Sequence, residues 1–138
     1  MTTAGYSGTP LQQKLGMKPG HRVAFVNAPP GFADQFRGGV DVLARLRGPL
    51  DVVVLFATRR ADLARRFPAA KRALATNGGL WVAWPKKASG VATDLRFEVV
   101  QPLGLDAGLV DNKVCAIDQT WSGLRFVYRL ADRAAARP

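Results

Sequence analysis

Short apolar runs alternate with amphipathic segments along this chain, and this alternation predicts a domain built from both strands and helices. The clearest run is LDVVVLFA at residues 50–57, which is rich in β-branched residues and has the length of a buried strand. The runs RVAFV at 22–26 and LWVAW at 80–84 predict two more buried strands, and VDVLARL at 40–46 predicts another.

Two longer segments place apolar residues at helical spacing. In residues 59–75 these positions share one helical face and are Leu63, Phe67, Ala70 and Leu74. Pro68 falls inside this pattern, so we expect a kink or a restart of the helix there. Thr93 or Asp94 is expected to cap a second helix, whose apolar positions are Leu95, Val99, Val100 and Leu103. A short helix after Thr9 and a helical turn within residues 32–36 complete the helical predictions.

The end of the chain differs from this alternation. Residues 113–117 and 124–130 both have the pattern of strands, and the connection between them is short enough for a hairpin. Because helices connect the earlier strands, those strands should be parallel. We therefore expect an α/β fold of three layers, with a mostly parallel sheet of about six strands that ends in an antiparallel hairpin.

Length and composition limit the alternatives. A chain of 138 residues suffices for one domain, which we place at residues 21–131, between an N-terminal arm with a short helix (1–20) and a flexible tail (132–138). No secretory signal or membrane span is visible, so the predicted location is the cytoplasm. The net charge of +10 favours solubility and would attract a nucleic acid or an acidic protein. The oligomeric state is left open.

Three stretches resemble parts of a class I methyltransferase core. KLGMKPGHRVAFVNAP resembles its opening helix, Pro-Gly turn, first strand and ligand-facing loop, and LDVVVLFATRRADLARRFPAAKRALATNGGLWVAWPKK resembles its middle. KVCAID and SGLRFVYRL resemble its terminal hairpin. The motifs GYSGTPLQQKLG, NAPPGF, WPKKASGV and TWSGLRFV are more closely similar to a bacterial family catalogued as a domain of unknown function, number 3052. Both resemblances imply a Rossmann-like sandwich, the first in truncated form.

The methyltransferase resemblance also implies S-adenosylmethionine as a cofactor, but two features of the sequence disfavour it. The cofactor loop of that family contains several glycines, whereas the loop here is Asn27-Ala28-Pro29-Pro30-Gly31. The stretch between residues 26 and 50 is also too short for the unit that would supply an acid to the ribose hydroxyls. We therefore expect no binding of S-adenosylmethionine with ordinary affinity, and the cofactor stays undefined.

Ligands of open α/β sheets bind beyond the carboxyl ends of the strands, where four loops of this chain should meet. An anion or nucleotide is the expected ligand, because these loops carry cations and a helix beginning near Thr93 would add N–H groups. The residues that we expect to form the site are Asn27, Gly31, Arg59, Lys86, Lys87, Ser89, Asp118 and Trp121. In the alternative interpretation, the lysines lie on a solvated loop and Trp121 covers the end of the sheet.

The residues for acid–base, nucleophilic or metal chemistry are few. His21 is the single histidine and precedes the first strand, at the opposite edge of the sheet from the expected site. Cys115 lies within a strand, where a core role is expected. We assign no catalytic and no metal-binding residue, and the leading hypothesis is a non-catalytic module that binds an anionic small molecule or nucleotide. The alternatives are a methyltransferase with a degenerate cofactor loop and a regulatory protein whose basic surface binds nucleic acid or an acidic partner.

Overall fold

The computed structural model describes residues 10–135 of the chain. Its helices are α1 (Leu11–Lys14), α2 (Arg60–Ala73), α3 (Phe97–Asp106) and α4 (Leu130–Ala135), with 3-10 turns η1 (Ala33–Phe36) and η2 (Lys87–Ser89). Its strands are β1 (Arg22–Val26), β2 (Asp41–Leu43), β3 (Leu50–Phe56), β4 (Leu74–Pro85), β5 (Leu109–Ala116) and β6 (Trp121–Tyr128).

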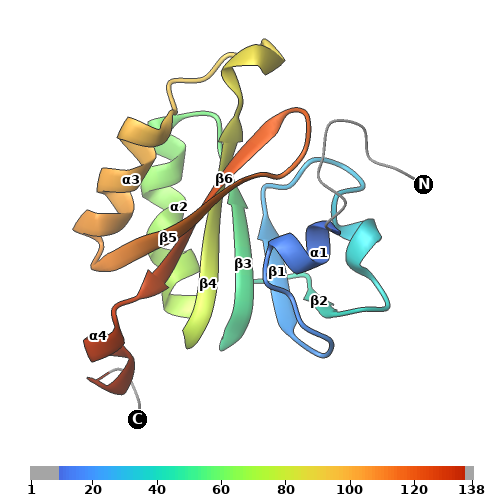
Figure 1. Ribbon diagram of the computed structural model, residues 1–138, viewed down its shortest axis with the longest axis vertical. Helices are drawn as coiled ribbons and strands as arrows, with labels where there is room; N and C mark the ends of the chain where they lie inside the picture. Colours follow the sequence, from blue (N-terminus) through green and yellow to red (C-terminus); the bar gives the residue numbers. More distant parts are fainter. Residues whose placement is uncertain (1–9, 136–138) are drawn as a thin grey trace.

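Within residues 10–135, the strands form one sheet in the order β2-β1-β3-β4-β6-β5 (Figure 1). The neighbours among β2, β1, β3 and β4 are parallel, whereas β6 runs antiparallel to both β4 and β5. Since β6 lies between β4 and β5, β5 points in the same direction as the parallel strands without pairing with them. This arrangement confirms the predicted α/β fold with a closing antiparallel hairpin.

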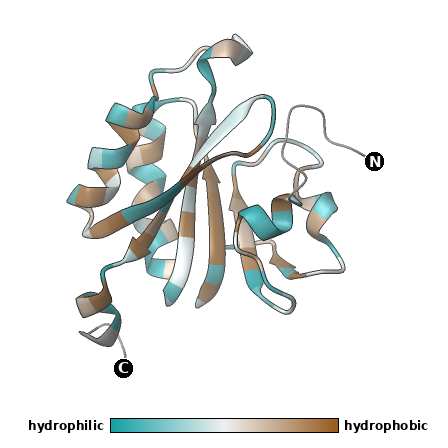
Figure 2. Ribbon diagram, in the orientation of Figure 1, coloured by the Kyte–Doolittle hydropathy of each residue, from teal (hydrophilic) through white to brown (hydrophobic). Residues whose placement is uncertain are grey.

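The central strand β3 shows why its sequence is apolar almost throughout. Val53 and Leu55 belong to a buried cluster with residues of α2 and α3, while Val52, Val54 and Phe56 belong to a second buried cluster on the opposite face. A strand covered on both faces has no polar side, so its apolar residues run consecutively. Figure 1 shows α2 and α3 on one side of the sheet and α1 on the other, and Figure 2 shows β3 as hydrophobic along most of its length.

The buried cluster on the face opposite α2 and α3 includes Leu15 and Met17, so it packs the segment after α1 against the sheet. The side chain of Trp81 on β4 is fully buried there, and its Nε1–H donates to the carbonyl oxygen of Leu15 at 3.0 Å. A buried indole N–H without a partner would be costly, so this bond fixes where the chain after α1 crosses the sheet.

Four strands differ by several residues in their bounds from the sequence-based prediction. β5 covers Leu109–Ala116 instead of residues 113–117, and β6 covers Trp121–Tyr128 instead of residues 124–130. β2 covers Asp41–Leu43 instead of residues 40–46, because it lies at the sheet edge and has three residue pairs with β1. β4 begins at Leu74 instead of residue 80, so the predicted turn Asn77-Gly78-Gly79 lies inside the strand. Glycine is required there because a Cβ at Gly78 would lie 2.8 Å from the carbonyl oxygen of Leu50.

The start of α3 was also predicted wrongly. The helix begins at Phe97, and neither Thr93 nor Asp94 caps it. Asp94 instead accepts a hydrogen bond from the backbone N–H of Arg60 at 2.7 Å and so caps the start of α2, which lies more than thirty residues earlier in the chain. α2 itself has the predicted apolar face and continues through Pro68, whose side chain is exposed.

The predicted ends of the domain are covered only in part. Residues 1–9 of the N-terminal arm and residues 136–138 of the tail lie outside the described part of the chain, and α4 occupies the start of the predicted tail. Among the described residues, no helix has both the length and the apolar character needed to cross a membrane. The cytoplasmic location stays a prediction.

Candidate functional site

The carboxyl edge of the parallel strands contains the point at which the strand order reverses. From β1 the chain continues to β2, which pairs with one edge of β1. It then crosses to β3, which pairs with the other edge of β1. In open α/β sheets this reversal leaves a crevice outside the strand ends, and ligands bind in it. The residues that follow β1 and β3 are therefore the first that could contact a ligand.

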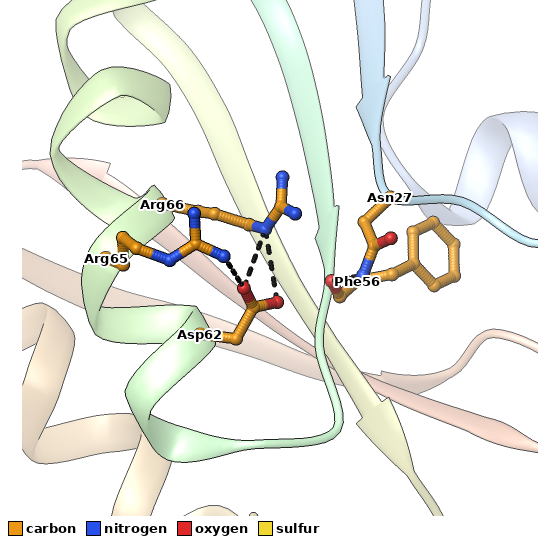
Figure 3. Close-up of polar contacts among 5 residues, drawn as sticks. All are labelled: Asn27, Phe56, Asp62, Arg65 and Arg66. Carbon is orange, nitrogen blue, oxygen red and sulfur yellow. Dashed lines mark hydrogen bonds and ion pairs between the residues drawn. The ribbon is translucent and has the colours of Figure 1, made fainter.

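Asn27 follows β1 and connects the end of this strand to the end of β3. Its backbone has φ of 58°, the left-handed conformation that asparagine tolerates better than most residues. Its Nδ2 donates to the carbonyl oxygen of Phe56, the last residue of β3, at 3.2 Å (Figure 3). Gly31, further along the same loop, has φ of 81° and no atom within 4 Å of the place a Cβ would take. The loop is therefore fixed to β3 by the side chain of Asn27, and there is free space beside the Cα atom of Gly31.

Aromatic rings fill the sheet edge next to this loop. Phe56 contacts Phe32 at a centroid distance of 4.9 Å and Trp121 at 5.0 Å, both edge to face. Phe32 in turn contacts Phe25 at 5.2 Å. Such pairs are stabilising beyond the area that they bury. Trp121 is thus half-buried against the end of β3, as expected of a ring that covers the sheet edge.

A pocket of about 250 Å³ opens beside the start of α2 and is lined by Arg59, Ala92, Thr93 and Asp94. The loop that carries Thr93 and Asp94 is tied to the end of β3, because Thr93 Oγ1 donates to the carbonyl oxygen of Thr58 at 2.6 Å. Arg59 is exposed, and it forms no ion pair with any residue of the described chain. The pocket therefore combines one unneutralised cation with hydroxyl and carboxylate oxygens.

The loop after β4 holds three of the predicted site residues. Ser89 Oγ donates to the carbonyl oxygen of Lys86 at 2.7 Å, so its hydroxyl is engaged within the loop. The backbone N–H of Lys86 donates to the carbonyl oxygen of Thr120, also at 2.7 Å. Lys86 is half-buried and Lys87 is exposed on η2. No described contact joins either lysine side chain to Arg59 or Trp121.

The carboxylate of Asp118 organises the turn between β5 and β6. Its Oδ1 accepts the backbone N–H groups of Thr120 and Trp121, each at 2.8 Å. This is an Asx turn, in which the side chain satisfies the backbone that it bends. Asp118 is therefore a structural acid of the turn that places Trp121.

The predicted residues thus fall into two groups. Phe56 and Thr120 link five of them, namely Asn27, Lys86, Ser89, Asp118 and Trp121. Arg59 belongs with the pocket. No described contact joins Gly31 or the side chain of Lys87 to either group. The sequence-based prediction missed Thr93 and Asp94 as site residues because their spacing suggested caps for α3. Their place directly after the loop at the carboxyl end of β4 was the signal that could have identified them.

Asp62 and Cys115 are two of the ionisable groups outside the pocket whose pKa values are shifted. The pKa of Asp62 lies below its usual value, mainly because the guanidinium of Arg66 donates hydrogen bonds to the carboxylate at 3.0 and 3.1 Å (Figure 3). Arg65 adds a second ion pair to the same carboxylate. Burial raises the pKa of the Cys115 thiol, although Lys14 and Lys113 act against it. The thiol is therefore protonated near neutral pH and a weak nucleophile.

Comparison with known proteins found similar structures but no similar sequence family. No protein-family model and no curated protein matches the chain, so the similarity to family 3052 is not confirmed. A SAM-dependent methyltransferase from Aquifex aeolicus has a TM-score of 0.61 and 14% identity, with 84% of this chain and 86% of that one covered. Magnesium protoporphyrin IX methyltransferase from Synechocystis PCC 6803 with bound SAM has a TM-score of 0.57 and 10% identity, with 80% and 71% covered.

These similarities show that the chain has a Rossmann-like methyltransferase fold. They also correct the expectation that S-adenosylmethionine is disfavoured as a cofactor, because solved proteins of this fold include one that holds that molecule. The leading sequence-based hypothesis, a non-catalytic anion-binding module, gains no support from the comparisons.

Proposed function

We propose that this chain binds S-adenosylmethionine at the carboxyl edge of its sheet and acts as a methyltransferase with a modified cofactor loop. The observation that carries the proposal is the pocket of Arg59, Thr93 and Asp94, which lies at the edge where sheets of this kind bind ligands. The structural similarity to methyltransferases, one of them with SAM bound, supports the same conclusion.

The lining residues fit one end of this cofactor. Arg59 offers a guanidinium, which binds a carboxylate through two parallel hydrogen bonds. Asp94 uses Oδ1 for the N–H of Arg60, which leaves its other oxygen for an ammonium or a hydroxyl group. A pocket of about 250 Å³ is smaller than a site for a whole drug-sized ligand, so it holds part of the molecule.

When bound, S-adenosylmethionine supplies a methyl group that is activated by a sulfonium centre. The chain's own contribution is positioning, since the two carboxylates at this edge, Asp94 and Asp118, are already hydrogen-bonded to backbone N–H groups. Holding two reactants in line is itself a large catalytic effect and needs no general base. The scarcity of acid–base residues therefore does not argue against this reaction.

Calorimetric titration of the full chain with S-adenosylmethionine and with its demethylated product S-adenosylhomocysteine tests the proposal. We expect saturable binding of both. Arg59→Ala should weaken binding about tenfold, because a charge-assisted hydrogen bond contributes about 1.5–3 kcal/mol. Asp94→Asn, which keeps the cap on Arg60, should weaken it several-fold.

Arg72→Ala is the matched control, because it removes an exposed arginine of α2 that does not line the pocket. It should leave the affinity unchanged. The absence of a binding heat for either compound with the folded wild-type chain would overturn the proposal. Equal losses for Arg59→Ala and Arg72→Ala would show that the pocket is not the site.

A further inference from the structure

Four cations, each from a different element, lie on or beside the sheet face opposite α2 and α3. They are Lys14 of α1, Lys113 of β5, Arg125 of β6 and Arg133 of α4, and we call them the cationic row. Arg125 is the register partner of both Trp81 and Lys113, and Trp81 belongs to the buried cluster of this face. Side chains of directly paired residues lie on the same face, so Arg125 and Lys113 are neighbours on it.

Arg125 is the unusual member of the row. It is half-buried and lies across Gly79 of β4, where a Cβ would stand 2.8 Å from its Cζ. Its guanidinium has no hydrogen bond and no ion pair with any residue of the described chain. Burial lowers the pKa of this guanidinium, and the charge of Arg133 lowers it further. A partly desolvated cation without a partner is unfavourable, and a bound anion would relieve that cost.

Lys113 and Arg133 donate to neutral backbone groups, and Lys14 also donates to one. Lys113 Nζ donates to the carbonyl oxygen of Lys14 at 3.0 Å, and Lys14 Nζ donates to that of Ala116 at 3.3 Å. Arg133 Nε donates to the carbonyl oxygen of Tyr128 at 3.1 Å. A backbone carbonyl positions the side chains of Lys113 and Arg133 but carries no charge that would neutralise them. Among the described residues, the ion pairs of the chain lie elsewhere, on Asp34, Asp62 and Glu98.

We propose that the cationic row binds the phosphate backbone of a nucleic acid. Its cations are spread over α1, the β5–β6 hairpin and α4, which suits a chain of phosphates better than a single anion. Guanidinium groups match phosphate oxygens in a bidentate geometry. The net charge of +10 would draw such a polyanion toward the molecule.

An acidic protein fits this surface less well. Protein interfaces have an apolar centre surrounded by polar residues. The exposed large apolar residues of the described chain are Val91, Leu105, Val114 and Leu130. Val114 pairs with Leu124, which belongs to the cluster of the other face, so Val114 does not lie on the face of Lys113 and Arg125. Lys113 and Arg125 are also separate from the proposed cofactor site, because the carboxyl edge lies at the pair Pro85–Trp121, four residues from Arg125 along β6.

The test measures binding of the full chain to a fluorescein-labelled single-stranded DNA by anisotropy, over a series of NaCl concentrations. We expect a Kd of about 10⁻⁶–10⁻⁴ M at physiological salt, with weaker binding as salt rises. Lys113→Gln combined with Arg125→Gln should weaken binding about tenfold. The slope of log K against log salt should become shallower by about 1.4, since each neutralised phosphate contributes about 0.7 for single strands.

Arg65→Gln combined with Arg72→Gln is the matched control, since it removes two charges from α2 on the other side of the sheet. This pair should change the affinity less than twofold, and Arg125→Lys, which keeps the charge, should keep most of the salt slope. Circular dichroism shows whether each variant is folded. Three outcomes would each overturn the proposal. They are equal effects of both double variants, no DNA binding at low salt, and displacement of DNA by polyglutamate at equal charge. Loss of S-adenosylmethionine binding with DNA binding intact would instead concern the proposed function alone.

Discussion

At the scale of single residues, Asn27 combines two functions that few side chains can combine. Its backbone adopts the left-handed conformation at the end of β1, and its side chain bonds to the carbonyl oxygen that ends β3 (Figure 3). The hydrogen bond joins the loop after β1 to the end of β3, next to the point where the strand order reverses. A residue with this role determines the shape of any ligand site at the sheet edge.

We predict that Asn27→Ala lowers the free energy of unfolding by about 2 kcal/mol, measured by urea denaturation. About 1 kcal/mol comes from the lost hydrogen bond and the remainder from placing alanine in a left-handed conformation. Asn27→Gly should cost less, since glycine adopts this conformation freely. An alanine variant at least as stable as the glycine variant would show that the backbone conformation at residue 27 relaxes when the side chain is lost.

Glycines at close contacts show what the sequence hides at this scale. Gly79 makes room for Arg125, and Gly104 of α3 lies so close to the ring of Phe126 that a Cβ would overlap it. In the sequence, Gly78 and Gly79 look like a turn, and Gly104 looks like a weak point in a helix. Each is explained by a residue distant in sequence, so local patterns could not have predicted their roles.

At the scale of elements, α2 is stabilised at its N-terminus in two ways. Asp94 caps it from a distant loop, and Asp62 places a carboxylate in its first turn, where the helix dipole favours negative charge. Asp62 also pairs with Arg66 and Arg65, four and three residues later. The apolar face of α2 could be predicted from spacing, but the cap could not, because it depends on the fold of residues 91–95.

The lowered pKa of Asp62 predicts a pH dependence for α2. A carboxylate whose pKa is lower in the folded state stabilises that state above its ordinary pKa of 3.8, and this stabilisation disappears as the pH falls through the folded pKa. Asp62→Asn should therefore lower the thermal midpoint by about two degrees at pH 7. The two midpoints should converge as the pH is lowered below 3.8.

Asp41→Asn is the control for this experiment, because Asp41 is exposed and forms no ion pair with the described residues. It should leave the midpoint nearly unchanged at both pH values. A constant difference between wild type and Asp62→Asn over the whole pH range would contradict the prediction, since it would point to a packing effect instead of an ionic one.

At the scale of the whole molecule, the order and direction of strands were more predictable than the site. Apolar runs such as residues 50–57 and the short connection between the last two strands are local signals, and they determine an α/β sheet with an antiparallel end. The pocket depends on how the loop with Thr93 and Asp94 is tied to Thr58. That contact joins distant segments, and the sequence around it contains no motif that predicts it.

The distribution of charge is a property of the whole chain. Ten excess positive charges on a domain of this size repel one another and destabilise the compact state. Arg125 contributes to this strain, because it is partly buried beside Arg133 and has no counter-charge among the described residues. Raising the ionic strength shortens the Debye length from about 30 Å at 0.01 M to about 8 Å at 0.15 M, so most of this repulsion is screened.

We therefore predict that NaCl raises the thermal midpoint of the wild-type chain by several degrees between about 0.01 and 0.15 M. Lys113→Gln combined with Arg125→Gln should have a higher midpoint at low salt and a flatter salt dependence, because it removes two neighbouring positive charges, one of them partly buried. Arg65→Gln combined with Arg72→Gln should flatten the dependence less, since Arg65 is neutralised by Asp62. Scanning calorimetry at fixed pH measures all three proteins. A wild-type midpoint that falls with NaCl over this range would show that attraction, not repulsion, dominates the electrostatics of the fold.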